Sequence, residues 1–232
     1  MGLSAKSRFA DGSSEYDAPQ AMIRAVRIHA LVAVIFLAAC ASTPPVADRS
    51  WYWLGTLQSL DAIDAPSPER YTLRIAADRA AIRADCNRGA GSVSLERDRV
   101  AFGPMALTRA FCPPPSRGDE YARQLQGASR LEVHGDVMRM ALKDGGTMFF
   151  AADPKALVAH YRCRDGKMMS VVYAGEAAQL WFDGAHYALA RERSASGARY
   201  GDGAVTFDTK GAFGSLSRGE AFPAQNCQVP GR

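Results

Sequence analysis

The stretch Met169–Leu189, with the sequence MSVVYAGEAAQLWFDGAHYAL, decides the fold that we expect for the last third of the chain. Tight-turn residues, Asp183-Gly184 within it and Gly201-Asp202-Gly203 after it, divide this region into short pieces. The pieces are apolar runs at 169–173, 179–182, 186–189 and 204–207. Because these short runs have no helical period, they predict strands of a small antiparallel β-barrel or β-sandwich.

Upstream, residues 51–153 have a mostly alternating apolar pattern, which predicts strands with one buried face. The residues that share a face are Tyr71, Leu73 and Ile75 in one strand, and Met138, Met140 and Leu142 in another. A turn at residues 143–146, KDGG, leads into Thr147–Phe150, and this order predicts a β-hairpin.

A single helix is predicted at residues 119–127 of the same region. Acidic residues occupy its first turn, Tyr121 and Leu125 lie four residues apart on one face, and Gly127 can end it. The chain is therefore expected to be mainly β, with a helix-bearing domain at 51–153 and a second domain at 158–229.

The N-terminal segment has the features of a secretory signal. Arg24 and Arg27 precede an apolar run, Ile28–Ala39, which is too short to cross a membrane because a spanning helix needs about 20 residues. The run ends in Leu37-Ala38-Ala39-Cys40, which resembles the bacterial lipobox, where the cysteine is lipidated and becomes residue one. We expect residues 1–39 to be a removed signal region, with Met22 as the true start.

Lipidation of Cys40 implies a membrane anchor of several acyl chains, palmitate among them, and one chain alone would bind only marginally. Residues 40–50, which include Thr43-Pro44-Pro45, are expected to form a flexible tether. Residue 41 is alanine and not aspartate. By resemblance to Gram-negative sorting rules, this favours the outer membrane of the cell envelope, with the protein facing the periplasm.

Four cysteines remain for the folded part, and export would place them in an oxidising compartment where disulfides persist. Four cysteines allow three pairings, and the division into two domains selects Cys86–Cys112 and Cys163–Cys227. A metal site is the rival interpretation, but no two of the four are close in sequence, and the histidines are scattered at His134, His160 and His186. We expect neither a metal nor another cofactor.

Charge and motifs exclude further classes of function. Without residues 1–39, 24 basic and 21 acidic residues remain, an excess too small to indicate nucleic-acid binding. We find no Gly-x-Ser-x-Gly elbow, no His-Glu-x-x-His and no phosphate-binding glycine loop. The pair Asp119-Glu120 lies at a helix start, where acidic side chains stabilise the helix. We therefore do not expect an enzyme, and no feature indicates an oligomeric state.

Two segments of the first domain resemble the META (HslJ-like) domain: residues 85–91, DCNRGAG, and residues 102–113, FGPMALTRAFCP. That family has a Cys-Asn motif and then a Thr-Arg followed shortly by Cys-Pro. The resemblance covers about residues 49–152 and implies a compact β-rich fold with one helix, found in secreted and envelope proteins linked to stress responses. It implies no known reaction, and Asn87, Thr108 and Arg109 are expected to be structural.

Further segments resemble MliC, the membrane-bound lysozyme inhibitor of C-type lysozyme: Tyr161-Arg162-Cys163, residues 194–200 (SASGARY), residues 207–211 and Asn226-Cys227. The resemblance spans about residues 158–229. It implies an eight-stranded antiparallel barrel closed by one disulfide, with a loop surface that enters the lysozyme cleft. In the family a serine and a lysine fourteen residues apart reach the catalytic acids, and here these are Ser196 and Lys210.

This assignment is chemically reasonable, because lysozyme uses one protonated and one ionised carboxyl group. The Lys210 ammonium has three donors and a compensating charge, while the Ser196 hydroxyl can both donate and accept. Gly197, which lets the backbone approach closely, Tyr200 as a rigid support and Gly211 complete the expected lysozyme-binding set. The expected function is thus inhibition of a C-type lysozyme by a lipid-anchored envelope protein.

One departure from the family pattern leaves an alternative open. The family usually has an aromatic and a hydroxyl residue before the lysine and an acidic pair after the glycine. Here Asp208-Thr209 precede Lys210, and Ala212-Phe213 follow Gly211. Asp208 could pair with Lys210 and compete with the target carboxylates. The alternative is a non-inhibitory envelope lipoprotein with a structural or stress-related role.

Overall fold

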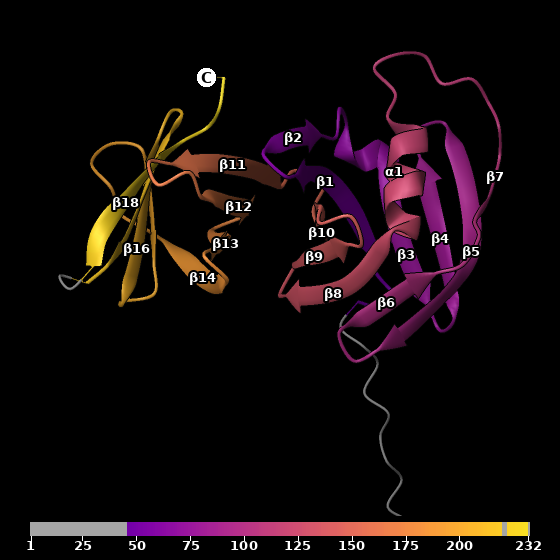
Figure 1. Cartoon of the computed structure of the whole chain (residues 1–232), viewed down its shortest axis with the longest axis horizontal. Coiled ribbons are helices and arrows are strands. Elements are labelled where there is room, and N and C mark those ends of the chain that lie inside the picture. Colours follow the sequence, from indigo (N-terminus) through magenta and orange to yellow (C-terminus); the bar gives the residue numbers. More distant parts are fainter. Residues whose placement is uncertain (1–45, 220–221, 232) are drawn as a thin grey trace, which may run out of the picture. The chain divides into compact units, whose positions relative to one another are not determined.

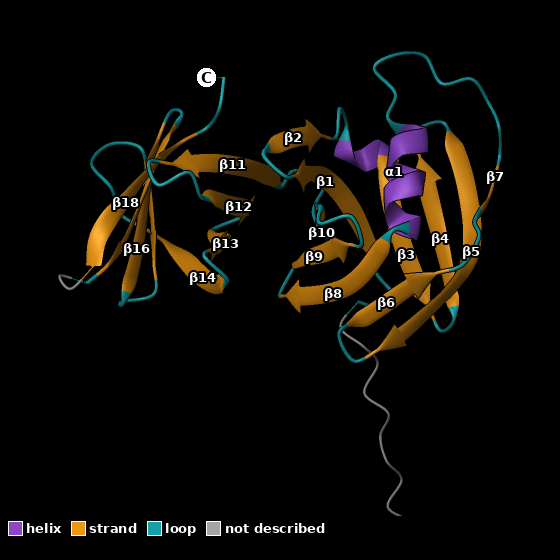
Figure 2. Ribbon diagram, viewed as in Figure 1, coloured by secondary structure: helices purple, strands orange, loops and turns teal. Residues whose placement is uncertain are grey.

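A computed structural model describes residues 46–219 and 222–231 of the chain. Within these ranges the regular structure consists of strands, a single α-helix and one 3-10 turn (Figures 1 and 2). The strands form two closed eight-stranded antiparallel barrels, the second of which is C-terminal. The predicted fold class is therefore confirmed: a β-rich domain with one helix precedes a small eight-stranded barrel.

The first barrel closes because its first strand pairs with its last. In order around the barrel, its strands are β10 (Thr147–Ala151), β9 (Val137–Leu142), β8 (Ala128–His134), β6 (Arg99–Phe102), β5 (Asn87–Glu96), β4 (Arg79–Ala84), β3 (Tyr71–Ala76) and β1 (Ser50–Gln58). Two short strands attach to it, β2 (Asp61–Asp64) to β1 and β7 (Ala106–Leu107) to β5, and the 3-10 turn η1 (Pro68–Arg70) precedes β3.

Alternating side chains fill the interior of this barrel, as the sequence predicts. Tyr71, Leu73 and Ile75 of β3 are all buried, and so are the three residues predicted to share a face in β9. The predicted hairpin is formed by β9 and β10. Trp51, Trp53 and Phe150 add large buried side chains to the same core.

The helix α1 (Gly118–Gln126) agrees with the predicted span to within one residue at each end. Tyr121 and Leu125 point into the core of the first barrel and are fully buried. Asp119 and Glu120 lie in the first turn, where their charges suit the positive end of the helix dipole. Gly127 is the C-cap residue.

The second barrel is a meander in which every strand pairs with the next along the chain, and the last closes on the first. Its strands are β11 (Leu157–Cys163), β12 (Met168–Ala174), β13 (Ala177–Phe182), β14 (Ala185–Glu192), β15 (Ala198–Gly201), β16 (Val205–Lys210), β17 (Phe213–Arg218) and β18 (Phe222–Gln228). The core includes Met169, Val171, Leu180, Phe207 and Leu216. The four predicted apolar runs correspond to β12, β13, β14 and β16.

Both predicted disulfides are present. Cys86 is bonded to Cys112 across 26 residues, and Cys163 to Cys227 across 64 residues. The second bond joins β11 to β18, where the two cysteines are direct cross-strand partners. In the chain-entropy description, loops of these lengths stabilise the fold by about 3.5 and about 4.3 kcal/mol.

Residues from Val46 onward, which were predicted to be part of the flexible tether, pack against the first barrel. Val46 is buried, its carbonyl oxygen accepts a hydrogen bond of 2.9 Å from Trp51 Nε1, and the Asp48 amide donates to the carbonyl of Ile75. These contacts hold residues 46–49 against β1 and β3, and Ser50 already belongs to β1, so the part of the predicted tether from Val46 onward is wrong. The predicted lipidation site, Cys40, lies outside the described residues.

The described residues, 46–219 and 222–231, group as one compact unit. Beside the two barrel cores, a third cluster of buried side chains includes Phe149, Val172 and Trp181. Across the part of the chain that the structure describes, no helix has both the length and the apolar character needed to cross a membrane.

Candidate functional site

The hairpin between β16 and β17 presents Lys210 at one end of the second barrel. Lys210 ends β16 and lies directly opposite Phe213, the first residue of β17. Gly211 follows Lys210 with φ of +59°, a left-handed conformation that glycine adopts without steric cost. The side chain of Lys210 is exposed, and Phe213 is 62% exposed.

A turn before β15 brings Ser196 to the same place. Gly197 has φ of +74°, and a Cβ atom built on it would lie 2.3 Å from the carbonyl oxygen of Thr209 and 3.1 Å from Cβ of Lys210. No larger residue could approach β16 so closely. The turn is further held by the Ser194 hydroxyl, which donates to the Ser196 carbonyl at 2.8 Å. As a result, Ser196 and Lys210 line one cavity of about 670 Å³.

Buried and half-buried hydroxyl groups support this part of β16 from inside the barrel. The Tyr161 hydroxyl lies 2.8 Å from that of Tyr173 and 3.1 Å from that of Thr209. Burial raises the pKa of Tyr173 above its usual value, so the Tyr173 hydroxyl stays protonated. Tyr200 is only 4% exposed, and its hydroxyl accepts a hydrogen bond from Arg191. Tyr200 is thus fixed in the core of the second barrel.

Asp208 has a partner other than the one considered from the sequence. Arg199, opposite it on β15, donates to both of its carboxylate oxygens, at 2.7 and 3.3 Å. This hydrogen bond raises the pKa of Arg199. Among the described residues, no carboxylate lies within ion-pair distance of Lys210. The Lys210 ammonium therefore remains available to an external acid.

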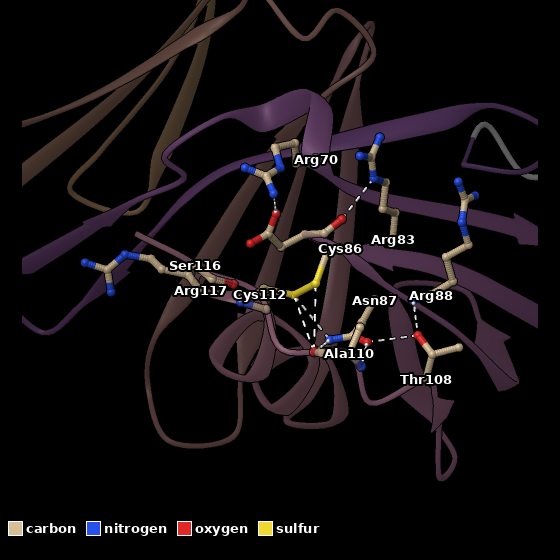
Figure 3. Close-up of a disulfide and its surroundings, with 12 residues drawn as sticks. Arg70, Arg83, Cys86, Asn87, Arg88, Thr108, Ala110, Cys112, Ser116 and Arg117 are labelled. Atoms are coloured by element: carbon tan, nitrogen blue, oxygen red, sulfur yellow. Dashed lines mark hydrogen bonds and ion pairs between the residues drawn. A yellow bond between two sulfur atoms is a disulfide. The ribbon is translucent and has the colours of Figure 1, made fainter. Parts of the chain in front are cut away.

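In the first barrel, the Cys-Asn and Thr-Arg-x-x-Cys segments meet around Asn87 (Figure 3). The Asn87 amide donates to the Ala110 carbonyl at 3.0 Å, while its oxygen accepts from the Thr108 hydroxyl at 2.9 Å and from the Ala110 amide at 2.7 Å. The Thr108 hydroxyl in turn accepts from the Arg88 amide. Every polar atom of the Asn87 side chain has a partner within the domain, so its geometry is that of a structural residue.

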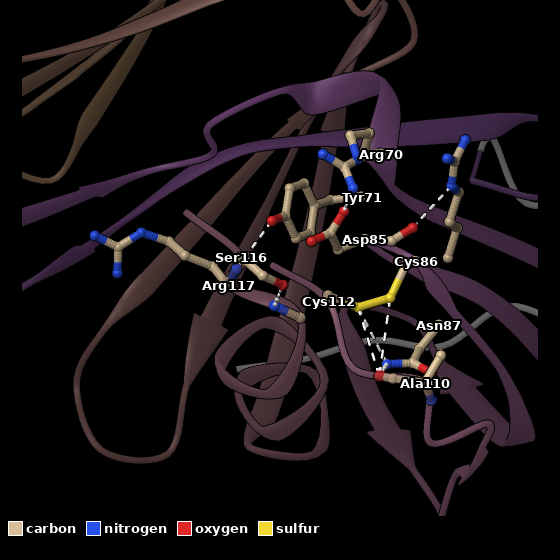
Figure 4. A network of polar contacts seen from close by, with 11 residues as sticks. Arg70, Tyr71, Asp85, Cys86, Asn87, Ala110, Cys112, Ser116 and Arg117 are labelled. Atoms are coloured by element: carbon tan, nitrogen blue, oxygen red, sulfur yellow. Dashed lines mark hydrogen bonds and ion pairs between the residues drawn. A yellow bond between two sulfur atoms is a disulfide. The ribbon is translucent and has the colours of Figure 1, made fainter. Parts of the chain in front are cut away.

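A second polar cluster lies beside the first disulfide (Figure 4). Asp85 is 1% exposed and forms an ion pair with Arg70, while the Tyr71 hydroxyl accepts from the Arg117 amide at 2.9 Å. The pairing compensates the buried charge of Asp85. The hydrogen bond to Tyr71 ties Arg117, at the end of the segment from β7 to α1, to strand β3.

Each of the two barrels matches a known protein family. Residues 46–155 match the META domain, and residues 161–225 match the family described as membrane-bound lysozyme-inhibitor of c-type lysozyme, MliC. The chain carries a META domain followed by an MliC domain. The MliC match supports, in general, a role as a membrane-bound lysozyme inhibitor in the cell envelope, with C-type lysozyme as the partner.

Other comparisons add little to the MliC assignment. An NMR structure of a protein from Burkholderia xenovorans is 25% identical, with a TM-score of 0.41, and the match covers 47% of this chain and 83% of that one. No curated protein matches the chain.

The MliC barrel gathers four of the five predicted binding residues at one end: Ser196, Gly197, Lys210 and Gly211. The fifth, Tyr200, is buried below them. Sequence reasoning missed Arg199, which holds Asp208, and the position of Phe213 opposite Lys210. Both arrangements depend on which residues lie opposite each other on neighbouring strands. The sequence alone does not give this register.

Proposed function

We propose that the MliC domain, about residues 158–229, inhibits a C-type lysozyme by placing Ser196 and Lys210 against its two catalytic carboxyl groups. The observation that supports this most is the exposed Lys210 ammonium, which has no carboxylate partner among the described residues. The close approach of Gly197 to β16 supports it further, because Ser196, the residue before Gly197, lines the same cavity as Lys210.

The electrostatics favour such a complex. An ammonium 4 Å from a carboxylate is attracted by about 1 kcal/mol in water and by about 4 kcal/mol at an effective dielectric of 20, which is typical near a protein surface. Lys210 suits the ionised carboxylate, and the Ser196 hydroxyl suits a group that is protonated. Arg199 supports the arrangement because it keeps Asp208 engaged.

The same proposal includes the anchor. A lipid on Cys40 would hold the protein at the outer membrane, facing the periplasm, beside the peptidoglycan that lysozyme attacks. Metabolic labelling with a palmitate analogue tests this step: label is expected in the wild type and not in Cys40→Ser. Equal labelling of both would contradict the lipid assignment.

Titration of the full-length protein against a C-type lysozyme tests inhibition. Lysis of peptidoglycan is expected to fall to background at micromolar protein. Lys210→Ala should raise the inhibition constant about tenfold or more, because a carboxylate in the cleft loses its partner. Lys155→Ala is a matched control, since it removes the same charge from an exposed site outside the MliC domain.

Two results would contradict the proposal. Full lytic activity at micromolar wild-type protein would exclude inhibition of that enzyme class, and equal effects of Lys210→Ala and Lys155→Ala would show that the lysine acts only through net charge.

A further inference from the structure

A row of side chains crosses four neighbouring strands at the end of the MliC barrel. Lys210 lies opposite Phe213, Phe213 opposite Gln228, and Gln228 opposite Arg162. Directly opposite residues of an antiparallel pair point to the same face, with Cβ atoms about 5 Å apart. All four residues are exposed. They form one continuous basic–aromatic row, defined here as Lys210, Phe213, Gln228 and Arg162.

The row has a defined length and chemistry. Neighbouring strands lie about 4.8 Å apart, so Lys210 and Arg162 are separated by about 14 Å along the row. Among the described residues, neither cation has a carboxylate within ion-pair distance. Between them, Phe213 presents a large apolar surface that is 62% exposed. Arg162, Phe213 and Lys210 also line the cavity that contains Ser196.

We propose that Phe213 and Arg162 are specificity-determining contacts that extend the inhibitory surface along the substrate groove of lysozyme. Phe213 packs on an apolar subsite beside the catalytic carboxyl groups, and Arg162 pairs with an acidic group on the groove rim about 14 Å from the Lys210 contact. This inference rests on the proposed function, because Lys210 fixes the position of the row in the groove.

The chemistry of the target explains why this partner fits. One catalytic carboxyl group of lysozyme is kept protonated by an apolar pocket, so apolar surface lies next to the acids that Lys210 would meet. An aromatic side chain held on a strand loses little entropy when it packs there, and such residues are frequent hot spots of interfaces. The planar guanidinium of Arg162 suits a carboxylate on the rim, which it can bind through two parallel hydrogen bonds.

Binding measurements with the full-length protein and a C-type lysozyme test the inference. Phe213→Ala is expected to raise the dissociation constant about tenfold, and Phe213→Trp should restore binding to within about threefold of the wild type. Leu157→Ala is the matched control, because Leu157 is a large apolar residue of the same barrel that is 68% exposed and lies outside the row. It should leave the constant unchanged within about twofold.

Arg162→Ala should weaken binding several-fold and reduce its dependence on salt, since one ion pair is lost. Unchanged melting temperatures would verify that the variants are folded. If Lys210→Ala weakens binding while Phe213→Ala and Arg162→Ala do not, the inference is overturned and the proposed function stands. If the wild type does not bind lysozyme, the proposed function itself fails.

Discussion

Gly197→Ala probes the contact that places Ser196 beside Lys210. The backbone cost comes first, since a left-handed residue with a Cβ atom is less stable by about 1–2 kcal/mol than in a right-handed conformation. Crowding adds to it: the new Cβ would lie 2.3 Å from the Thr209 carbonyl oxygen, whereas ordinary contact begins at 3.4 Å. The turn must therefore retreat from β16 by about 1 Å.

The expected result has two parts. The free energy of unfolding should fall by about 2 kcal/mol, and lysozyme inhibition should weaken about tenfold or more, because the Ser196 hydroxyl moves away from Lys210. Urea unfolding measures the first effect. Titration against lysozyme measures the second, at a urea-free condition where both proteins are fully folded.

Gly203→Ala is the matched control. Gly203 lies in the turn between β15 and β16 with φ of +89°, and nothing is within 4 Å of a Cβ atom built on it. Gly203→Ala should therefore lower the free energy of unfolding only by the cost of a left-handed alanine, and it should leave inhibition unchanged. If Gly203→Ala and Gly197→Ala have equal effects on both stability and inhibition, the close approach to β16 has no role in the site and the reasoning is refuted.

Three further predictions concern the surroundings of the site and the two barrels. Arg199→Ala should weaken inhibition, because Asp208 then becomes free to pair with the site lysine; the double variant with Asp208→Ala should recover it, and a failure to recover would contradict this explanation. Asn87→Ala should lower the free energy of unfolding by about 2–4 kcal/mol, because the Thr108 hydroxyl and the Ala110 backbone lose three hydrogen bonds to its side chain, while inhibition stays unchanged. Burial lowers the pKa of His160 from 6.5 to about 4. The unfolded chain therefore binds more protons at this histidine between these values, so the contribution of His160 to stability should be constant above pH 6.5 and fall by about 3 kcal/mol towards pH 4; urea unfolding of His160→Gln should lack this component, and an identical pH profile would contradict the assignment.

Much of the fold could be predicted because its signals are local. Tyr71, Leu73 and Ile75 alternate with polar neighbours, so a barrel strand can be recognised from six residues. The hairpin of β9 and β10 is marked by its turn, and the disulfides follow once the chain is divided into two domains. The helix α1 is marked by the four-residue spacing of Tyr121 and Leu125 and by the glycine at its C-terminal end.

The features that escaped prediction are those set by distant residues. β17 and β18 contain many small or polar residues and few apolar ones, as in Gly214, Ser215 and Leu216. They are strands because they pair with β16, with each other and with β11, and these pairings close the barrel. Val46 directly follows two prolines, so the sequence there predicts a flexible tether. In the structure, however, the Val46 carbonyl oxygen accepts a buried hydrogen bond from the Trp51 indole.

The candidate site was predicted in the same uneven way. Ser196 and Lys210 could be found from their spacing and family resemblance. The pairing of Arg199 with Asp208 and the position of Phe213 between two cations could not, since both depend on the register between strands.

A double-mutant cycle tests the central claim most directly. It would pair Lys210→Ala with replacement of the ionised catalytic carboxylate of a C-type lysozyme by its amide, and the four dissociation constants would be measured at one pH and one salt concentration. The coupling energy is predicted to be about 1.5 kcal/mol or more, as measured for close interfacial charge pairs. Additive effects, with a coupling energy near zero, would contradict a direct contact between the Lys210 ammonium and that carboxylate.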